Sequence, residues 1–337
     1  MTDDTTDWRL LSLAPVPRER VIAWFGAIPG LRLDVPDERT PDAVRAVIAR
    51  ADIVVTDWSG ALRVDATEVA LARRLSFVMS PGVGLDNIDL DALTAAGVVV
   101  ANTAGLNAPS VAEWCLGAAF AVARSLVWVD GRIRDGDWPQ LELPERGSTE
   151  IAGLRVGVVG FGAVGSRVAG LFRAVGCEVA YWTRRRRSAG EESGATWMRL
   201  AELAARSDVL VVNLSLTPET RGLVDAAILA ELPRGAIVID ASRGGVVDHI
   251  ALFGAIETGS LRGAAIDVFE REPLGADSPL RRSDRILLSS HAAATTAQSL
   301  ARIFSLVTDN VRRAVAGEPV RSVVNGLGPV VVRRAGG

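Results

Sequence analysis

The stretch RVGVVGFGAVG at residues 155–165 decides the fold of this 337-residue chain. An apolar run, typical of a buried strand, leads directly into Gly160-x-Gly162-x-x-Gly165, and residues 166–175 can form a helix. In such a unit the first glycine permits the tight turn, the second lets a pyrophosphate approach the backbone, and the third allows close packing of helix on strand. Unpaired N–H groups at the helix N-terminus bind the phosphates. The stretch therefore predicts a dinucleotide-binding domain rather than an ordinary glycine-rich turn.

The composition is that of a globular protein with about two domains. Hydrophobic residues make up 49% of the chain and charged residues 23%, which leaves ample apolar material for cores. The net charge of −3 gives no general attraction to nucleic acid or to an anionic membrane, so neither is expected as a partner. All 37 cationic residues are arginine, which excludes Schiff-base chemistry on a lysine.

The cysteines and the apolar runs bear on metal content and location. Cys115 and Cys177 both lie in apolar settings, so we expect reduced core residues, no disulfide framework and no metal site. Residues 1–7 are acidic and polar, unlike the basic and then apolar start of a signal peptide. The apolar run 114–123 ends at Arg124 and is too short to span a bilayer. We therefore predict a cytoplasmic protein with no membrane partner.

Strand-like and helix-like segments alternate in the first third of the chain, which predicts a parallel sheet covered on both faces. The expected strands are residues 9–14, 53–56, 77–80 and 98–102, and the expected helices are residues 18–25, 42–49, 67–73 and 90–95. One long helix is then expected from residue 110 to about residue 131, followed by an extended polar excursion over 135–150.

A second series of strands and helices begins at residue 154. Its further strands are expected at residues 178–182, 209–214, 236–240, 263–268 and 286–290, which completes a six-stranded dinucleotide-binding unit. A final helix over 295–316 remains after this unit. We therefore expect a discontinuous first domain, built from both ends of the chain.

Three polar segments follow the carboxyl ends of strands in the second series, at residues 239–248, 265–273 and 289–293. Ligands bind at this edge of open α/β sheets. An arginine, a carboxylate and a histidine together suit carbonyl reduction, because the arginine binds a substrate carboxylate and a carboxylate-oriented histidine gives a proton to the carbonyl oxygen. Of the two histidines, His291 fits this role. His249 stands at a helix start and is expected to be a surface or capping residue.

Several motifs in order resemble the D-isomer-specific 2-hydroxyacid dehydrogenase family, the group of D-3-phosphoglycerate, D-lactate and glyoxylate/hydroxypyruvate reductases. The likeness runs from about residue 53 to residue 311. The segment SPGVGLDNID at 80–89 resembles the family's carboxylate-binding loop. NTAGLN at 102–107 with SVAE at 110–113 resembles its interdomain crossover and long helix, and LTPETRGL at 216–223 resembles the stretch after its third nucleotide strand.

The resemblance implies an α/β fold in which a Rossmann dinucleotide-binding domain, residues 104–291, is inserted in a smaller flavodoxin-like substrate-binding domain, residues 1–103 and 292–337. A cleft between the two domains would hold cofactor and substrate. The implied catalytic residues are Arg243, Glu272 and His291. The implied substrate-binding residues are Val83, Gly84, Arg243 and His291. The expected cofactor-binding residues are Gly160, Phe161, Gly162, Ala163, Val164, Gly165, Thr183, Arg184, Leu214, Ser215, Ala241, Arg243, Asp267 and His291.

The chain departs from the family pattern at several positions that affect local backbone shape. Family members usually carry proline where Ala104 and Ser215 stand, and Thr-Pro where residues 289–290 precede the histidine. An acidic residue is usual at His249. No catalytic position is lost. Formate dehydrogenases of this family resemble the chain less, because they use glutamine where Glu272 stands.

The segment after the second nucleotide strand bears on the choice of cofactor. An acidic residue that binds the adenosine ribose is expected about 20 positions beyond the first glycine. Thr183 stands there instead, followed by four arginines at 184–187. Thr183 and Arg184 can bind a 2′-phosphate that an acid would repel, so we predict NADP, with NAD as a possible cofactor. The alternative is that the arginines form only a solvated loop.

Substrate clues are fewer. Phosphoglycerate dehydrogenases typically carry a basic residue in the loop that corresponds to residues 56–60, where Asp57 would repel a phosphate. We also expect no regulatory domain after the last helix. A small unphosphorylated 2-oxo acid, glyoxylate or hydroxypyruvate, is therefore favoured over D-3-phosphoglycerate or phosphite. Trp58 and Met79 either shape the substrate pocket or are ordinary packing residues. The alternative from another class is a non-catalytic nucleotide-sensing binding protein, which the intact set of three residues disfavours.

The resemblance also implies a homodimer formed by the nucleotide domains. The helix over 110–131 and the arm after it would cross between subunits, with Trp128 and Trp138 at the interface. Trp138 is the candidate to reach the partner's active site. Its alternative role is an intramolecular anchor.

Overall fold

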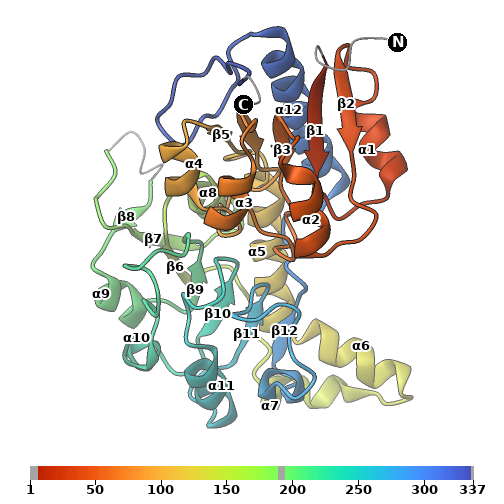
Figure 1. Cartoon of the computed structure of the whole chain (residues 1–337). Coiled ribbons are helices and arrows are strands. Elements are labelled where there is room, and N and C mark those ends of the chain that lie inside the picture. The colour runs from red at the N-terminus through yellow and green to blue at the C-terminus, as the bar shows by residue number, and fades with distance from the viewer. Residues whose placement is uncertain (1–6, 189–193, 335–337) are drawn as a thin grey trace. The chain divides into compact units, whose positions relative to one another are not determined.

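The computed structural model describes residues 7–188 and 194–334, which form two compact units. Unit 1 comprises Met1–Asn107 with Ala297–Gly337, and unit 2 comprises Ala108–Thr296 (Figure 1). Both ends of the chain thus belong to unit 1. Most of the acidic N-terminal segment on which the predicted location rests lies outside the described residues.

Unit 1 is built on a five-stranded parallel sheet in the order β2-β1-β3-β4-β5. This is the flavodoxin-like order, as expected. Strands β3 and β4, inside the sheet, are short apolar runs buried on both faces, as in a sheet covered by helices. The strands are β1 (Trp8–Ser12), β2 (Leu31–Asp34), β3 (Ile53–Val55), β4 (Phe77–Met79) and β5 (Val99–Ala101).

Helices cover both faces of the unit 1 sheet. One apolar core joins the sheet to α1 and α12, and another joins it to α2, α3 and α4. Helix α12 comes from the C-terminal end of the chain, coloured blue in Figure 1, and packs against α1 near the N-terminus. The helices are α1 (Arg18–Phe25), α2 (Pro41–Ile48), α3 (Ala66–Leu71), α4 (Leu90–Ala95) and α12 (Ala297–Ala316).

Unit 2 is built on a seven-stranded parallel sheet in the order β12-β11-β10-β9-β6-β7-β8. Counted from its own first strand this is 3-2-1-4-5-6-7, a Rossmann sheet with one strand added. The strands are β6 (Arg155–Val159), β7 (Glu178–Trp182), β8 (Thr196–Trp197), β9 (Val209–Val212), β10 (Ile237–Asp240), β11 (Gly263–Ile266) and β12 (Ile286–Leu288).

Helices α5 and α8 cover one face of this sheet, and α9, α10 and α11 cover the other. The α-helices of unit 2 are α5 (Ala108–Ala123), α6 (Leu126–Arg134), α7 (Leu143–Arg146), α8 (Ala163–Ala174), α9 (Leu200–Ala205), α10 (Ala226–Glu231) and α11 (His249–Glu257). The two 3-10 helices are η1 (Pro139–Leu141) and η2 (Pro279–Arg282).

The single long helix predicted over 110–131 is wrong, because two helices, α5 and α6, meet at a bend of 60°. Ser125 lies at the break with a left-handed φ of 51°. The N–H of Thr149, far along the chain, donates to the carbonyl of Ala123 at 3.0 Å. That bond satisfies a carbonyl near the end of α5. The excursion over 135–150 is also more ordered than expected, since it contains η1 and α7.

Within the described residues, no single helix is long and apolar enough to cross a membrane. The bent pair of α5 and α6 passes the same test when taken together, on length and composition alone. Many residues of α5 are buried in the apolar core of unit 2.

Candidate active site

The carboxyl edge of the unit 2 sheet collects the residues singled out from the sequence. Gly160 follows β6, Thr183 follows β7, Ala241 follows β10 and Asp267 follows β11. Leu214 and Ser215 come two and three residues after β9. Since all these strands run parallel, their ends meet at one edge, where ligands bind in open α/β sheets.

The glycine turn has the close approaches that such a site requires. Gly160 has a φ of 96°, and a Cβ there would lie 2.5 Å from the carbonyl oxygen of Asn213. A Cβ on Gly165 would lie 1.9 Å from the carbonyl oxygen of Gly160, so helix α8 can pack this closely only through glycine. At Gly162, the residue before α8, a Cβ would have nothing within 4 Å. Packing explains the first and third glycines, whereas the second faces open space.

The other turn residues are held by the core of unit 2 and by helix α8. Ala163 and Val164 form the start of α8. Phe161 is buried and stacks on Tyr181, with ring centroids 4.1 Å apart. Its side chain therefore belongs to the core, and only its backbone can serve a ligand.

The segment after β7 is more engaged than its sequence indicates. The Thr183 hydroxyl donates to the carbonyl of Arg185 at 2.6 Å, and its own carbonyl accepts from the Trp197 indole at 3.1 Å. Arg184 lies 3.7 Å from the carboxylate of Glu219, and both side chains are largely exposed. A carboxylate thus lies beside the predicted phosphate-binding arginine, although none occupies position 183.

Two of the three predicted catalytic residues are in direct contact. His291 Nδ1 lies 2.8 Å from Glu272 Oε2. The other carboxylate oxygen of Glu272 accepts from the Phe269 N–H at 3.0 Å. With Nδ1 donating to the carboxylate, Nε2 of His291 is the nitrogen that can exchange a proton with a ligand.

The carboxylate of Glu272 is held in its ionised form. Partial burial by itself raises the pKa of Glu272, but the opposing effects are larger. The hydrogen bonds from His291 and Phe269, with the nearby charges of His291 and Arg243, bring the pKa below its ordinary value. A charged partner for an imidazolium is therefore present at neutral pH.

Asp267 fixes the backbone of the His291 turn. Its two carboxylate oxygens accept from the N–H groups of Ala292 and Ala293 at 2.8 and 3.0 Å, and its carbonyl accepts from the His291 N–H at 2.7 Å. His291 itself has a left-handed φ of 57°, which is uncommon for a residue with a side chain. Asp267 is almost fully buried, and this carboxylate holds the histidine in that conformation.

Arg243 lies in the turn that follows β10. Its guanidinium donates to the carbonyl of Ser242 at 2.9 Å. The next residue, Gly244, packs so closely on the β11 loop that a Cβ would lie 2.1 Å from the Phe269 carbonyl group. The turn that carries Arg243 is thus packed directly against the segment that carries Glu272.

His249 does not match its predicted surface position. It is only 9% exposed, and its Nε2 lies 2.8 Å from a carboxylate oxygen of the fully buried Asp240. The capping role belongs to its neighbour Asp248, which accepts from the N–H groups of Ile250 and Ala251. Asp240 was not among the residues predicted for the site, although an acid at the end of the apolar strand IVID indicates that it has a partner.

Val83 and Gly84 lie in unit 1, in the loop after β4. The carbonyl of Val83 accepts from the Asn102 amide at 2.9 Å, and the carbonyl of Pro81 accepts from the Thr103 hydroxyl at 2.9 Å. Among the described residues, the N–H groups of Val83 and Gly84 donate no hydrogen bond. The loop therefore has its carbonyls engaged and two donors available for an anion.

The expectation that Asp57 would repel a phosphate is wrong, because its carboxylate is fully buried and neutralised. Arg39 lies 2.7 Å from it, and the N–H groups of Ser59 and Leu62 also donate to it. Arg39 in addition donates to the carbonyls of Leu13 and Ala14, at the carboxyl end of β1. The cluster is therefore a neutral pair in which the acid is buried and the arginine is partly exposed.

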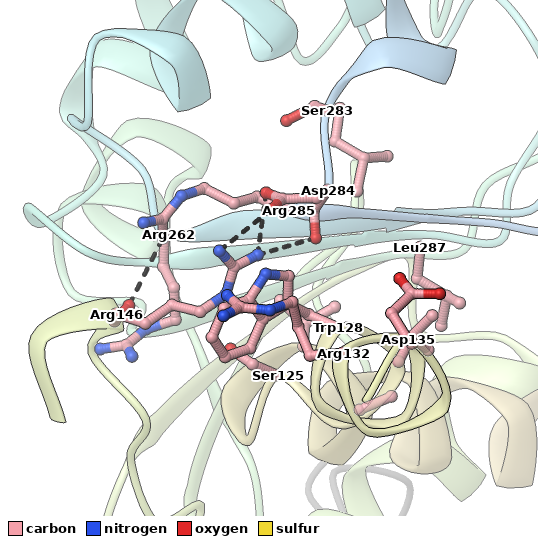
Figure 2. Close-up of a pocket in the computed structure, with 15 residues that line it drawn as sticks. Ser125, Trp128, Arg132, Asp135, Arg146, Arg262, Ser283, Asp284, Arg285 and Leu287 are labelled. Atoms are coloured by element: carbon pink, nitrogen blue, oxygen red, sulfur yellow. Dashed lines mark hydrogen bonds and ion pairs between the residues drawn. The ribbon is translucent and has the colours of Figure 1, made fainter. Parts of the chain in front are cut away.

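An open hollow of about 390 Å³ lies elsewhere in unit 2 and includes none of the predicted site residues (Figure 2). Trp128 forms part of its wall, with the guanidinium groups of Arg132 and Arg146 at 5.1 and 4.4 Å from its ring. Arg262 and Arg285 also line it and precede β11 and β12, so the hollow borders the amino ends of those strands. It is therefore separate from the carboxyl edge where the glycine turn lies.

The residues at the carboxyl edge fit a bound dinucleotide. The space at Gly162 is open, the turn that contains it is held by the close contacts of Gly160 and Gly165, and helix α8 begins directly after it. The side-chain amide nitrogen of Asn213, next to this turn, is buried and has no partner within the described residues. An open backbone cradle at a helix N-terminus is the usual pyrophosphate site of this fold.

The fold and the site together define a dinucleotide-binding α/β protein with a histidine–carboxylate pair at its ligand edge. Residues 116–293 match the family described as D-isomer specific 2-hydroxyacid dehydrogenase, NAD binding domain. The chain belongs to this family.

The curated relatives of this chain are named for different activities. A D-3-phosphoglycerate dehydrogenase of Mycobacterium leprae is 39% identical over 294 residues, which cover 86% of this chain and 54% of that relative. The chain thus spans about half the length of the first curated relatives that it matches. A glyoxylate reductase of Aeropyrum pernix is 34% identical over 272 residues, covering 78% of this chain and 80% of that protein.

Solved structures support the fold. The holo form of Rhodotorula graminis D-mandelate dehydrogenase superposes with a TM-score of 0.87, covering 97% of this chain and all of that one, at 22% identity. The TT0316 protein from Thermus thermophilus gives a TM-score of 0.83 at 28% identity over 94% of this chain.

Proposed function

We propose that the protein reduces a small 2-oxo acid to its D-2-hydroxy acid with a nicotinamide dinucleotide. The observation that carries the proposal is the contact between His291 and Glu272 at the sheet edge that also bears the glycine turn. A carboxylate-bound histidine at a ligand edge is the arrangement of a general acid.

The roles of this chain's own residues follow from their chemistry. Arg243 binds the substrate carboxylate through its planar guanidinium. His291 gives a proton from Nε2 to the carbonyl oxygen as that oxygen becomes negative, and Glu272 stabilises the charged imidazole. The cofactor, when bound, supplies the hydride for the carbonyl carbon. The donors of Val83 and Gly84 are proposed as a second site for the substrate carboxylate.

Glyoxylate and hydroxypyruvate are the proposed substrates. The match to the glyoxylate reductase supports this choice, because it covers most of this chain and most of that protein. A specific observation favours a second candidate: Arg39 neutralises Asp57 and remains partly exposed, which removes the repulsion expected against a phosphate. A D-3-phosphoglycerate dehydrogenase activity is therefore the alternative.

The test is a panel of three substrates with each cofactor. Purified protein is mixed with glyoxylate, hydroxypyruvate or 3-phosphohydroxypyruvate and with NADPH or NADH, and the loss of nicotinamide absorbance gives kcat/KM. The proposal expects the highest kcat/KM for an unphosphorylated acid, and near-complete loss in His291→Ala. A higher kcat/KM for the phosphorylated acid would favour the alternative. Turnover that survives His291→Ala would refute the mechanism.

We propose NADP as the preferred cofactor and NAD as the second choice. Thr183 provides a neutral position where an acid would repel a 2′-phosphate, and Arg184 provides an exposed cation next to it. The carboxylate of Glu219 competes with a phosphate for Arg184, which makes the preference moderate rather than strict.

A homodimer in the cytoplasm is the proposed state of the protein. Apolar side chains are exposed along α6 and the segment after it, including Val127, Trp138 at 79% and Leu141 at 86%. Exposure of this kind on one segment marks an interaction surface. The high exposure of Trp138 favours contact with a partner over an intramolecular anchor, and its reach into a partner's site stays a proposal.

A further inference from the structure

A buried polar cluster supports the Arg243 turn, and the proposed chemistry does not use it directly. The cluster consists of Asp240 at the end of β10, Ser242 in the turn and His249 at the start of α11. Asp240 is fully buried, Ser242 is 2% exposed and His249 is 9% exposed. A carboxylate in such surroundings is costly unless each of its oxygens has a partner, so the arrangement is specific.

Asp240 links the two ends of the turn that carries Arg243. One of its carboxylate oxygens accepts from the N–H of Ser242 at 3.0 Å and from the Ser242 hydroxyl. The other oxygen is 2.8 Å from Nε2 of His249. The eight residues from Ala241 to Asp248 are therefore held at both ends by one side chain.

The cluster also contacts the segment that carries Glu272. The His249 ring meets the ring of Phe269 edge-on, with centroids 6.1 Å apart. The N–H of Phe269 donates to the Glu272 carboxylate, and its carbonyl group lies against Gly244, next to Arg243. Phe269 therefore contacts His249, the Glu272 carboxylate and the residue next to Arg243.

We propose that Asp240 and His249 are positioning residues that hold Arg243 where it can bind the substrate carboxylate. Two apolar side chains would fill the same volume, but a hydrogen bond between buried groups also fixes the orientation of the groups it joins. The Arg243 guanidinium needs a fixed orientation, because it binds a carboxylate by two parallel hydrogen bonds. The effect on turnover rests on the proposed function, whereas the effect on the turn does not.

The experiment compares two substitutions of one residue. His249→Leu keeps the bulk and removes the donor to Asp240, whereas His249→Gln keeps an N–H donor at similar reach. Ile250→Gln is the matched control, because Ile250 is the next residue of α11 and is largely exposed. Hydrogen–deuterium exchange of residues 241–248 is measured by mass spectrometry, and kcat and KM are measured with glyoxylate.

The proposal expects amide exchange in 241–248 to be about ten-fold faster in His249→Leu and the KM for glyoxylate to rise about ten-fold, the effect of one hydrogen bond. His249→Gln and Ile250→Gln should match the parent protein. Ser242→Ala is the second variant, to be used if His249→Leu does not fold. It keeps the Asp240–His249 pair and removes only the hydroxyl bond to the turn, so it should give the same changes at smaller size.

Two results would overturn the proposal. One is a His249→Leu protein with a lower melting temperature but with unchanged exchange in 241–248 and unchanged KM, since the pair would then be only a fold contact. The other is a His249→Gln protein as impaired as His249→Leu. If the parent protein reduces no 2-oxo acid, the proposed function fails, and the exchange comparison still decides the positioning role.

Discussion

Replacing Glu272 by glutamine tests the proposed acid–base pair with little change of shape. The carboxylate accepts from His291 Nδ1 at 2.8 Å and from the Phe269 N–H at 3.0 Å, and an amide can accept only one of these bonds. A hydrogen bond to a charged group contributes about 1.5–3 kcal/mol. Because the two side chains are 40% and 33% exposed, solvent screens the pair, and we take the lower end, about 1.5 kcal/mol.

A loss of about 1.5 kcal/mol corresponds to roughly a ten-fold change in a rate. The charged imidazole is the proton donor for reduction and loses its charged partner in Glu272→Gln, so kcat should fall about ten-fold at neutral pH. The assay is the rate of glyoxylate reduction at saturating cofactor across the pH range. Glu270→Gln makes the same chemical change two residues earlier and should leave the profile unmoved. Identical profiles for Glu272→Gln and the parent would refute the pair.

The same substitution has an effect on stability with a defined sign. The pKa of Glu272 is lowered in the folded protein, so its ionised form adds stability above the unfolded value of about 4.3 and loses that contribution as the pH falls through the folded value. Chemical denaturation should therefore show Glu272→Gln less stable than the parent at neutral pH. The gap should close in acid. A gap that persists unchanged in acid would mean that the substitution acts through packing instead.

Three further predictions test the cofactor site and the assembly. Gly165→Ala should lower the melting temperature, because its Cβ would lie 1.9 Å from a carbonyl oxygen, whereas Gly162→Ala should keep the melting temperature and weaken NADPH binding at least about ten-fold by fluorescence titration. Arg184→Ala should raise the KM for NADPH and leave that for NADH nearly unchanged. Glu219→Gln should improve NADPH affinity by no more than about five-fold, because the pair is exposed, and no change in either variant would reduce the arginine run to a solvated loop. Light scattering at micromolar concentration should give a dimer that Leu141→Asp converts to monomer, and a monomeric parent would end the dimer proposal.

The buried strands could be predicted from the sequence because burial on both faces leaves a continuous apolar run. The β9 run VLVV and the β10 run IVID are of this kind. Strand β2 was missed because its sequence LRLD is short, charged at alternate positions and only half-buried at the sheet edge. Two-residue β8 is shorter than any pattern can indicate. Edge strands owe their structure to the neighbour that they pair with, and that neighbour is not visible in the local sequence.

The break between α5 and α6 shows the limit of helical periodicity. No proline or glycine occupies residues 121–128, so propensity alone predicts an unbroken helix. The carbonyl of Ala123 instead accepts from Thr149, and Ser125 takes a left-handed φ. A residue 26 positions away thus supplies the bond that helps to end α5. The compact unit 2 runs from Ala108 to Thr296, whereas the resemblance implied a domain over residues 104–291.

Strand ends indicated where the site residues gather but not how their charges pair. The rule that ligands bind at carboxyl ends brings Asp240, Asp267, Glu270 and Glu272 to the same edge, and only the resemblance to a family singles out Glu272. In the structure each of the two buried acids has its own structural task. Asp267 holds the His291 turn, and Asp240 holds the Arg243 turn through Ser242 and His249.

Buried charges were the least predictable part of the site, because a side chain's sequence shows its type and not its partner. Asp57 looked like a negative charge at the substrate edge, yet it is neutralised by Arg39, 18 residues earlier in the loop before α2. His249 looked like a surface residue, yet Asp240 lies nine residues before it at hydrogen-bond distance. In both cases an acid at or just beyond the end of an apolar strand was the available signal, since an ionised group there must be paired. An acid at the end of an apolar strand therefore predicts a cation or a histidine within reach, and both pairs follow this rule.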